Sequence, residues 1–109
     1  MSAESEAGTF RPPRFDVEVT EEDGTVVLRL SGELDLVSEP ILEAALARAK
    51  GSPVRVDLSD LAFMDSTGLR ALLGAARTYP DLKLVGPLQA PVRRLLDLTQ
   101  THAILPFES

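Results

Sequence analysis

The stretch that decides the fold is VRVDLSDLAFMDSTGLRALLGAA, residues 54–76. Apolar and polar residues alternate over residues 54–59, and this period of two predicts a β-strand. Over residues 69–76, leucine and alanine recur at helical spacing, which predicts an amphipathic helix. Between them lies a polar corner, MDSTG at residues 64–68, where a serine and a threonine stand at the expected start of the helix. The stretch therefore predicts a strand, a corner and a helix in direct succession.

The corner places hydroxyl groups at a helix N-terminus. Free backbone N–H groups and the helix dipole favour a negative group there, so the fold could accept a phosphate on one of these hydroxyls. Such a phosphate would change the local charge by about −1.5 to −2 at neutral pH. We interpret the corner as a candidate switch. The structural alternative is that Ser66 and Thr67 are plain N-caps, with Gly68 allowing close backbone packing.

The N-terminal half continues the alternation of strands and turns. Residues 1–13 are polar and are predicted to form a flexible tail. Residues 15–19 and 26–30 alternate with period two, and the turn residues 21–24 predict that they form an antiparallel hairpin. The glycine-containing segment 32–35 is expected to end the second strand. Asp57, Asp60 and Asp65 would then cluster after the third strand.

Helix signals separate the remaining strands. Ser38 is expected to cap a helix that stops at Gly51, and the helix of the central stretch is expected to end at Pro80. Residues 82–85 predict a short fourth strand. Pro91 opens a third helix, and residues 103–107 are expected to be extended.

These elements define the fold class. Strands separated by helices imply parallel crossovers, and the hairpin adds an antiparallel pair. Three strands alternate polar and apolar residues, which a sheet covered on both faces would not do. We therefore expect an α/β protein with one domain over residues 14–109. It should have a mixed sheet of four to five strands, with its helices mainly on one face.

Composition limits the function. The 109 residues contain no cysteine, which excludes disulfides and cysteine metal sites. No apolar run approaches the roughly 20 residues of a membrane span, and no export signal is recognisable, so a cytoplasmic location away from membranes is expected. Seventeen acidic residues against eleven basic ones argue against nucleic acid or an anionic membrane as partner.

Enzymatic alternatives are poorly supported. A serine hydrolase needs a base beside its nucleophile, but the chain has one histidine, His102, and lacks the Gly-x-Ser-x-Gly elbow. Asp57, Asp60 and Asp65 could hold Mg²⁺, as in a receiver phosphorylated on aspartate. However, the acidic pair and the late lysine that a receiver needs are missing. We therefore predict no catalytic activity, no metal site and no cofactor.

Four stretches, in order, resemble a STAS domain of the anti-sigma factor antagonist type. They are LSGELDL at 30–36, VDLS at 56–59, FMDSTGL at 63–69 and PVRRLLDLT at 91–99. The resemblance covers residues 15–107, nearly the whole globular part, and implies a STAS-like single domain. Two departures stand at the C-terminal end. Gln100 and Thr101 replace the usual Gly-Leu step, so the third helix should have an unusual C-cap, and the final helix of many relatives is expected to be short or missing.

The resemblance also implies a mechanism. In this family the serine after the aspartate, here Ser66, is phosphorylated by the anti-sigma factor, which is an ATP-dependent serine/threonine kinase, and Thr67 is a secondary site. The unphosphorylated antagonist binds the anti-sigma factor and releases the sigma factor, and a PP2C-type serine phosphatase resets it. The resemblance places Asp35 and Asp65 beside the phosphoserine. It places Gly68 and Leu69 in the docking surface.

Two other classes remain open at this point: a STAS module with a different partner, and an enzyme or a receiver phosphorylated on aspartate. A STAS interaction module could serve a stressosome or a lipid-transport complex as an accessory subunit, with Arg70, Arg77 and Arg93 contacting that partner. In either role the chain is expected to be a monomer or a weak dimer.

Overall fold

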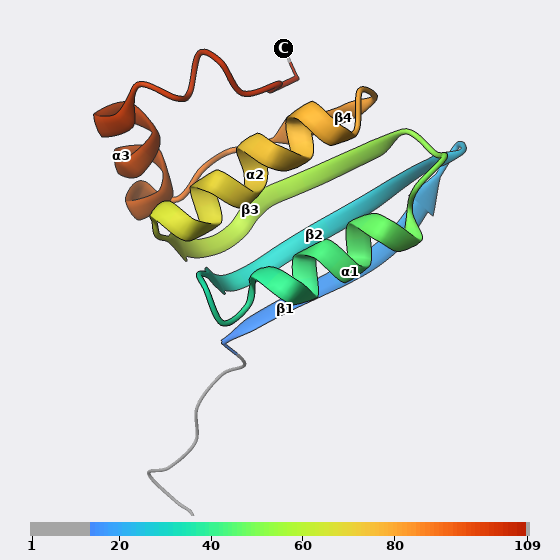
Figure 1. The fold of residues 1–109 in the computed structure, drawn as a ribbon, viewed down its shortest axis with the longest axis horizontal. Helices are drawn as coiled ribbons and strands as arrows, with labels where there is room; N and C mark the ends of the chain where they lie inside the picture. Colours follow the sequence, from blue (N-terminus) through green and yellow to red (C-terminus); the bar gives the residue numbers. More distant parts are fainter. Residues whose placement is uncertain (1–13, 109) are drawn as a thin grey trace, which may run out of the picture.

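The structure is a computed structural model that describes residues 14–108, so the tail predicted over residues 1–13 lies outside the described residues. Its strands and helices alternate in the predicted order (Figure 1). They are β1 (Phe15–Glu22), β2 (Thr25–Leu34), α1 (Glu39–Arg48), β3 (Val54–Met64), α2 (Ser66–Thr78), β4 (Leu82–Val85) and α3 (Ala90–Thr99).

The strands form a mixed four-stranded sheet in the order β1-β2-β3-β4. The hairpin β1–β2 is antiparallel, whereas β2–β3 and β3–β4 are parallel. Figure 1 shows α1 and α2 side by side across one face of this sheet, with α3 at the end where β3 finishes. The predicted single α/β domain is confirmed, and so is the placement of the helices mainly on one face.

The core lies between the sheet and the two crossover helices. Leu28, Val56 and Leu84 are aligned across three neighbouring strands, and each is almost completely buried. Leu42 and Leu46 of α1 are buried in the same core. Burying one such side chain contributes about 1.5–3 kcal/mol, so the period-two alternation is stabilised by the burial of one face.

Two strands run further than the pattern predicts. β2 continues through Gly32 to Leu34. The β2–β3 pairing is irregular next to Gly32, where its register shifts, but it resumes at Glu33. Gly32 has a φ of 89°, and a side chain there would collide with the backbone carbonyl of Arg14. β3 continues to Met64, so Asp57 and Asp60 lie within the strand, and the prediction that they follow it is wrong.

The C-terminal segment differs from the expected extended form. Residues 102–104 form a turn, and only Phe107 makes a β-bridge, to Leu84. His102 stacks on Phe107 with ring centroids 4.6 Å apart. The predicted irregular end of α3 is present, since Gln100 caps the helix in the left-handed conformation with a φ of 58°.

Candidate functional site

The candidate site lies at the edge of the sheet where the two central strands end. β2 and β3 are parallel, and their last paired residues are Leu34 and Met64. Asp35 and Asp65 come next, at equivalent positions. Because parallel strands end at the same edge, α1 and α2 also begin there (Figure 1). The fold therefore places two aspartates, 30 residues apart in the sequence, at the same edge of the sheet.

Asp65 is the N-cap of α2. Its Oδ1 accepts a hydrogen bond from the backbone N–H of Gly68 at 3.0 Å, and its carbonyl accepts the first helical bond, from Leu69, at 2.9 Å. The Asp65 N–H donates to the Leu34 carbonyl at 3.3 Å, which ties the cap to the end of β2. The alternative that Ser66 and Thr67 are the N-caps is therefore wrong, because the aspartate supplies the capping oxygen.

Ser66 is the first residue of α2 and is exposed, whereas Thr67 is half-buried. The N–H groups of the first helical turn have no partner further back within the helix, and Asp65 satisfies only that of Gly68. The Ser66 hydroxyl therefore stands on the surface at the positive end of the helix dipole, where a phosphate is electrostatically favoured.

Gly68 and Leu69 shape this surface from beneath. Both are buried, and Leu69 is 6% exposed. A Cβ on Gly68 would lie 2.5 Å from the Leu34 carbonyl oxygen and 2.8 Å from Cγ of Met64. The glycine is therefore required for α2 to start directly against the end of β2. Their place in a docking surface stays a prediction.

Asp35 organises the loop between β2 and α1. Its Oδ1 accepts hydrogen bonds from the backbone N–H groups of Val37 and Ser38, each at 3.1 Å. In return, the Ser38 hydroxyl accepts a bond from the Asp35 N–H at 2.9 Å. This exchange is the pattern of a capping box. The Glu39 N–H already donates to the Asp35 carbonyl at 2.9 Å, so the first turn is anchored at Asp35. Ser38 occupies the N-cap position of α1, as predicted, but its hydroxyl makes no cap hydrogen bond to the helix and instead donates to the Glu33 carbonyl at the end of β2.

Arg14 is a residue of this edge that the sequence did not indicate. Its guanidinium donates to Oδ2 of Asp35 at 2.6 Å and lies 3.8 Å from the carboxylate of Glu33. No local pattern marks Arg14, because the contact joins residues 21 positions apart and depends on the hairpin register.

The comparison with known families decides the identity of this fold. A family model described as "Mlab, STAS domain" matches residues 17–106. The chain belongs to the STAS domain family.

Individual relatives of this STAS domain are named as antagonists of anti-sigma factors. It is 31% identical over 100 residues to the anti-sigma F factor antagonist of Paenibacillus polymyxa, covering 85% of this chain and 86% of that protein. It is 31% identical over 101 residues to the anti-sigma-B factor antagonist of Bacillus subtilis, with 87% and 92% covered. The family resemblance found in the sequence is thereby confirmed.

Solved structures agree. An anti-sigma factor antagonist from Mycobacterium paratuberculosis superposes with a TM-score of 0.75 at 29% identity, over 85% of this chain and 84% of that one. The anti-sigma factor antagonist SpoIIAA in its unphosphorylated form gives a TM-score of 0.64 at 25% identity, over 87% and 88%.

Exposed apolar side chains also stand near the ends of the two central strands of this STAS domain, close to Asp35 and Asp65 in the sequence. Leu36 and Val37, in the loop after β2, are 68% and 69% exposed, and Phe63, near the end of β3, is 45% exposed. Large exposed apolar groups gathered at one edge are typical of a protein interaction surface. Sequence periodicity does not reveal them, since a loop leucine and a strand-end phenylalanine do not differ in pattern from core residues.

Within residues 14–108, the structure contains no group of three or more histidine, aspartate or glutamate side chains placed to hold a metal ion. None of the helices in that range is both long and apolar enough to cross a membrane.

The pKa of the Asp35 carboxyl group is held below its ordinary value, first by the hydrogen bond from the Ser38 backbone N–H. The Ser38 hydroxyl, the positive charge of Arg14 and the Val37 N–H act in the same direction, whereas partial burial opposes them. The STAS domain therefore keeps this carboxylate ionised in mildly acidic solution.

This lowered pKa predicts a pH-dependent stability. The ionised Asp35 stabilises the fold above the ordinary aspartate pKa, and the contribution is lost as the pH falls toward the lower folded-state pKa. Asp35→Asn removes the titrating group. We expect the wild type to melt at a higher temperature than the variant at neutral pH, with the difference shrinking between about pH 5 and pH 3. Thermal melts followed by circular dichroism measure it, and a difference independent of pH would contradict the assigned role.

Proposed function

We propose that this STAS domain is an anti-sigma factor antagonist whose binding to its partner is switched off by phosphorylation of Ser66. One observation carries the proposal. An exposed serine is the first residue of α2, directly after the N-cap Asp65, on an edge that also exposes apolar side chains. The position combines access for a kinase with a surface suited to docking.

The relatives support the proposed role. Those from Paenibacillus and Bacillus are named as antagonists of anti-sigma factors. The similar SpoIIAA structure is that of an antagonist in its unphosphorylated form. By this likeness, the partner of the present chain is an anti-sigma factor, and we assign it serine/threonine kinase activity. A PP2C-type serine phosphatase would reverse the reaction in the cytoplasm, and the domain itself would act without catalysis or cofactor.

Docking in the unphosphorylated state would use Leu36, Val37 and Phe63, whose burial against a partner is favourable. The buried Gly68 and Leu69 position the start of α2 beneath that surface. The chain would act as a monomer or weak dimer that offers this edge to the anti-sigma factor.

Phosphorylation would act through charge and not through refolding. The helix N-terminus accommodates a phosphate on Ser66, with Thr67 as a secondary acceptor, so the fold is preserved. Asp65 and Asp35 already place two carboxylates at this edge. A further charge of about −1.5 to −2 at Ser66 would have to be desolvated beside them when the partner docks, and this cost weakens the complex.

The proposal is tested by incubating the purified chain with ATP and lysate of its own organism, followed by mass-spectrometric mapping of phosphate. We expect one dominant phosphate on Ser66, which Ser66→Ala abolishes and the matched control Ser59→Ala retains. The phosphate should resist hydroxylamine, which would cleave an aspartyl phosphate. Label that persists in Ser66→Ala would contradict the assignment. If an active lysate leaves the chain unlabelled, the alternative of an interaction module in a stressosome or lipid-transport complex is favoured.

A further inference from the structure

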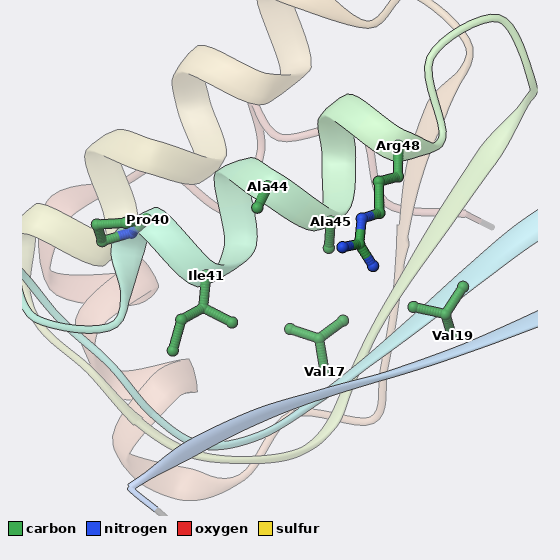
Figure 2. Close-up of a pocket in the computed structure, with 7 residues that line it drawn as sticks. All are labelled: Val17, Val19, Pro40, Ile41, Ala44, Ala45 and Arg48. Carbon is green, nitrogen blue, oxygen red and sulfur yellow. The ribbon is translucent and has the colours of Figure 1, made fainter.

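A second surface lies away from Ser66, between the edge strand β1 and the helix α1. It is a groove with a cavity volume of about 430 Å³. The residues that line it are Val17, Val19, Pro40, Ile41, Ala44, Ala45 and Arg48. Figure 2 shows the two valines pointing from β1 toward α1, and Ile41 and Ala45 pointing from α1 toward β1. We call this surface the β1–α1 groove.

The β1–α1 groove leaves apolar side chains accessible. Val19 is 58% exposed and Ile41 is 49% exposed, although both face the side of the sheet that elsewhere forms the core. The cause is the sheet order: β1 is the last strand on this side, so no further strand or helix of the described residues covers them. The groove thus continues the apolar surface of the core, but its side chains remain exposed to solvent.

The backbone beside the groove is also open. In an antiparallel pair, every second residue directs its N–H and C=O groups to its neighbour, and the others point away. Among the strands formed by residues 14–108, β1 has only β2 as a neighbour, so about half of its backbone groups face the free edge. An incoming strand would find hydrogen-bonding groups along β1 and apolar contacts under α1. Because α1 is ten residues, about 15 Å, long, it would cover about four residues of that strand.

The acidic side chains of β1 indicate which kind of strand could bind beside it. β1 carries Asp16, Glu18, Glu21 and Glu22, all exposed. Among residues 14–108, only Glu18 of these four has an ion pair, with Arg29 at 3.7 Å. A second copy of β1 would oppose acidic residues to acidic residues, which is unfavourable and guards against self-association. A strand with basic residues on the face opposite α1 would instead meet complementary charges.

We propose that the β1–α1 groove binds an extended segment of a partner protein as a fifth strand, with apolar residues of that segment facing α1 and basic residues alternating with them. The apolar side chains fill the space beside Val17, Val19 and Ile41. The basic side chains lie opposite Asp16 and Glu18, whose alternation in β1 sets the required period of two. This site is separate from Ser66, so the domain can hold one partner segment while its other edge is regulated.

The test uses the full chain and an eight-residue peptide with acetylated and amidated ends, in which lysine and valine alternate. Its length matches the eight residues of β1. Titration is followed by amide chemical shifts in NMR spectra. We expect saturable shifts confined to β1 and the groove-facing side of α1, weakening with added salt. A peptide with the same composition in two blocks, four lysines and then four valines, should bind at least about tenfold more weakly. Equal binding of the two peptides would show charge attraction alone and overturn the proposal.

Two further measurements test the geometry. Ala44→Arg places a long cation in the groove and should weaken binding at least about tenfold, whereas Ala47→Arg, an exposed position on α1 that does not line the groove, should not. N-methylation of either all valines or all lysines removes half of the peptide N–H donors. Strand addition requires that one version loses binding and the other retains it. Equal effects of both methylations, or shifts located at Ser66 instead of β1, would refute the fifth strand.

Discussion

Gly68→Ala is expected to lower the free energy of unfolding by about 2–3 kcal/mol, because it overpacks the junction between β2 and α2. The added methyl carbon would lie 2.5 Å from the Leu34 carbonyl oxygen and 2.9 Å from Cγ of the same residue. The oxygen belongs to the sheet backbone and already accepts a hydrogen bond from Asp65, so it cannot move without breaking that contact. Either α2 shifts outward or the cap opens.

Gly74→Ala is the matched control for this substitution. Gly74 lies in the same helix, and a Cβ there would meet nothing within 4 Å. Replacing an unhindered helical glycine by alanine should raise the stability by about 0.5–1 kcal/mol. Urea denaturation of the two variants and the wild type measures both changes. If Gly68→Ala were as stable as Gly74→Ala, the close approach at the start of α2 would not constrain the site.

Phosphate on Ser66 is expected to weaken binding to the anti-sigma factor at least about 100-fold, or about 2.7 kcal/mol. The magnitude follows from burying a doubly charged group next to Asp65 and near Asp35 in a docked surface. Calorimetric titration of the anti-sigma factor with the phosphorylated and unphosphorylated chains, without ATP, measures the ratio. The loss should be smaller at high salt, where surface repulsion is screened.

The phosphorylated chain itself supplies the control for this experiment. Because a negative group at a helix N-terminus is stabilising, its melting temperature should be equal to or above that of the unphosphorylated chain. A lower melting temperature would mean that phosphate acts by disturbing α2, and unchanged affinity would remove the switch altogether.

The sequence was sufficient for the order of the elements but not for their ends. Alternation in residues 54–59 correctly indicated a half-buried strand, because one face of β3 packs against helices. The same pattern fails after Ser59, where the β2–β3 register shifts and the in–out order changes. Periodicity assumes a regular ladder, so it ended β2 near Gly32 and β3 before Met64. The structure instead extends both strands to the edge that carries the candidate site.

At that edge, local motifs were visible and long-range contacts were not. The corner around Ser66 could be recognised because a helix start has a local signature. Which oxygen performs the capping could not, since Asp65, Ser66 and Thr67 are all good N-cap residues. The ion pair between Arg14 and Asp35 depends on the hairpin register. The exposure of Phe63 depends on how distant parts of the chain pack. Neither is encoded in any short stretch of sequence.

Asp65 caps α2, whereas Ser66 is the proposed phosphate acceptor. This separation of roles affects how such a protein can change during evolution. Because the aspartate fastens α2 to the sheet, the neighbouring hydroxyl is dispensable for folding. Substitutions at position 66 are therefore nearly invisible to the quality control that removes unstable proteins. A lineage could lose the serine in one step and keep an intact domain that can no longer be phosphorylated at position 66.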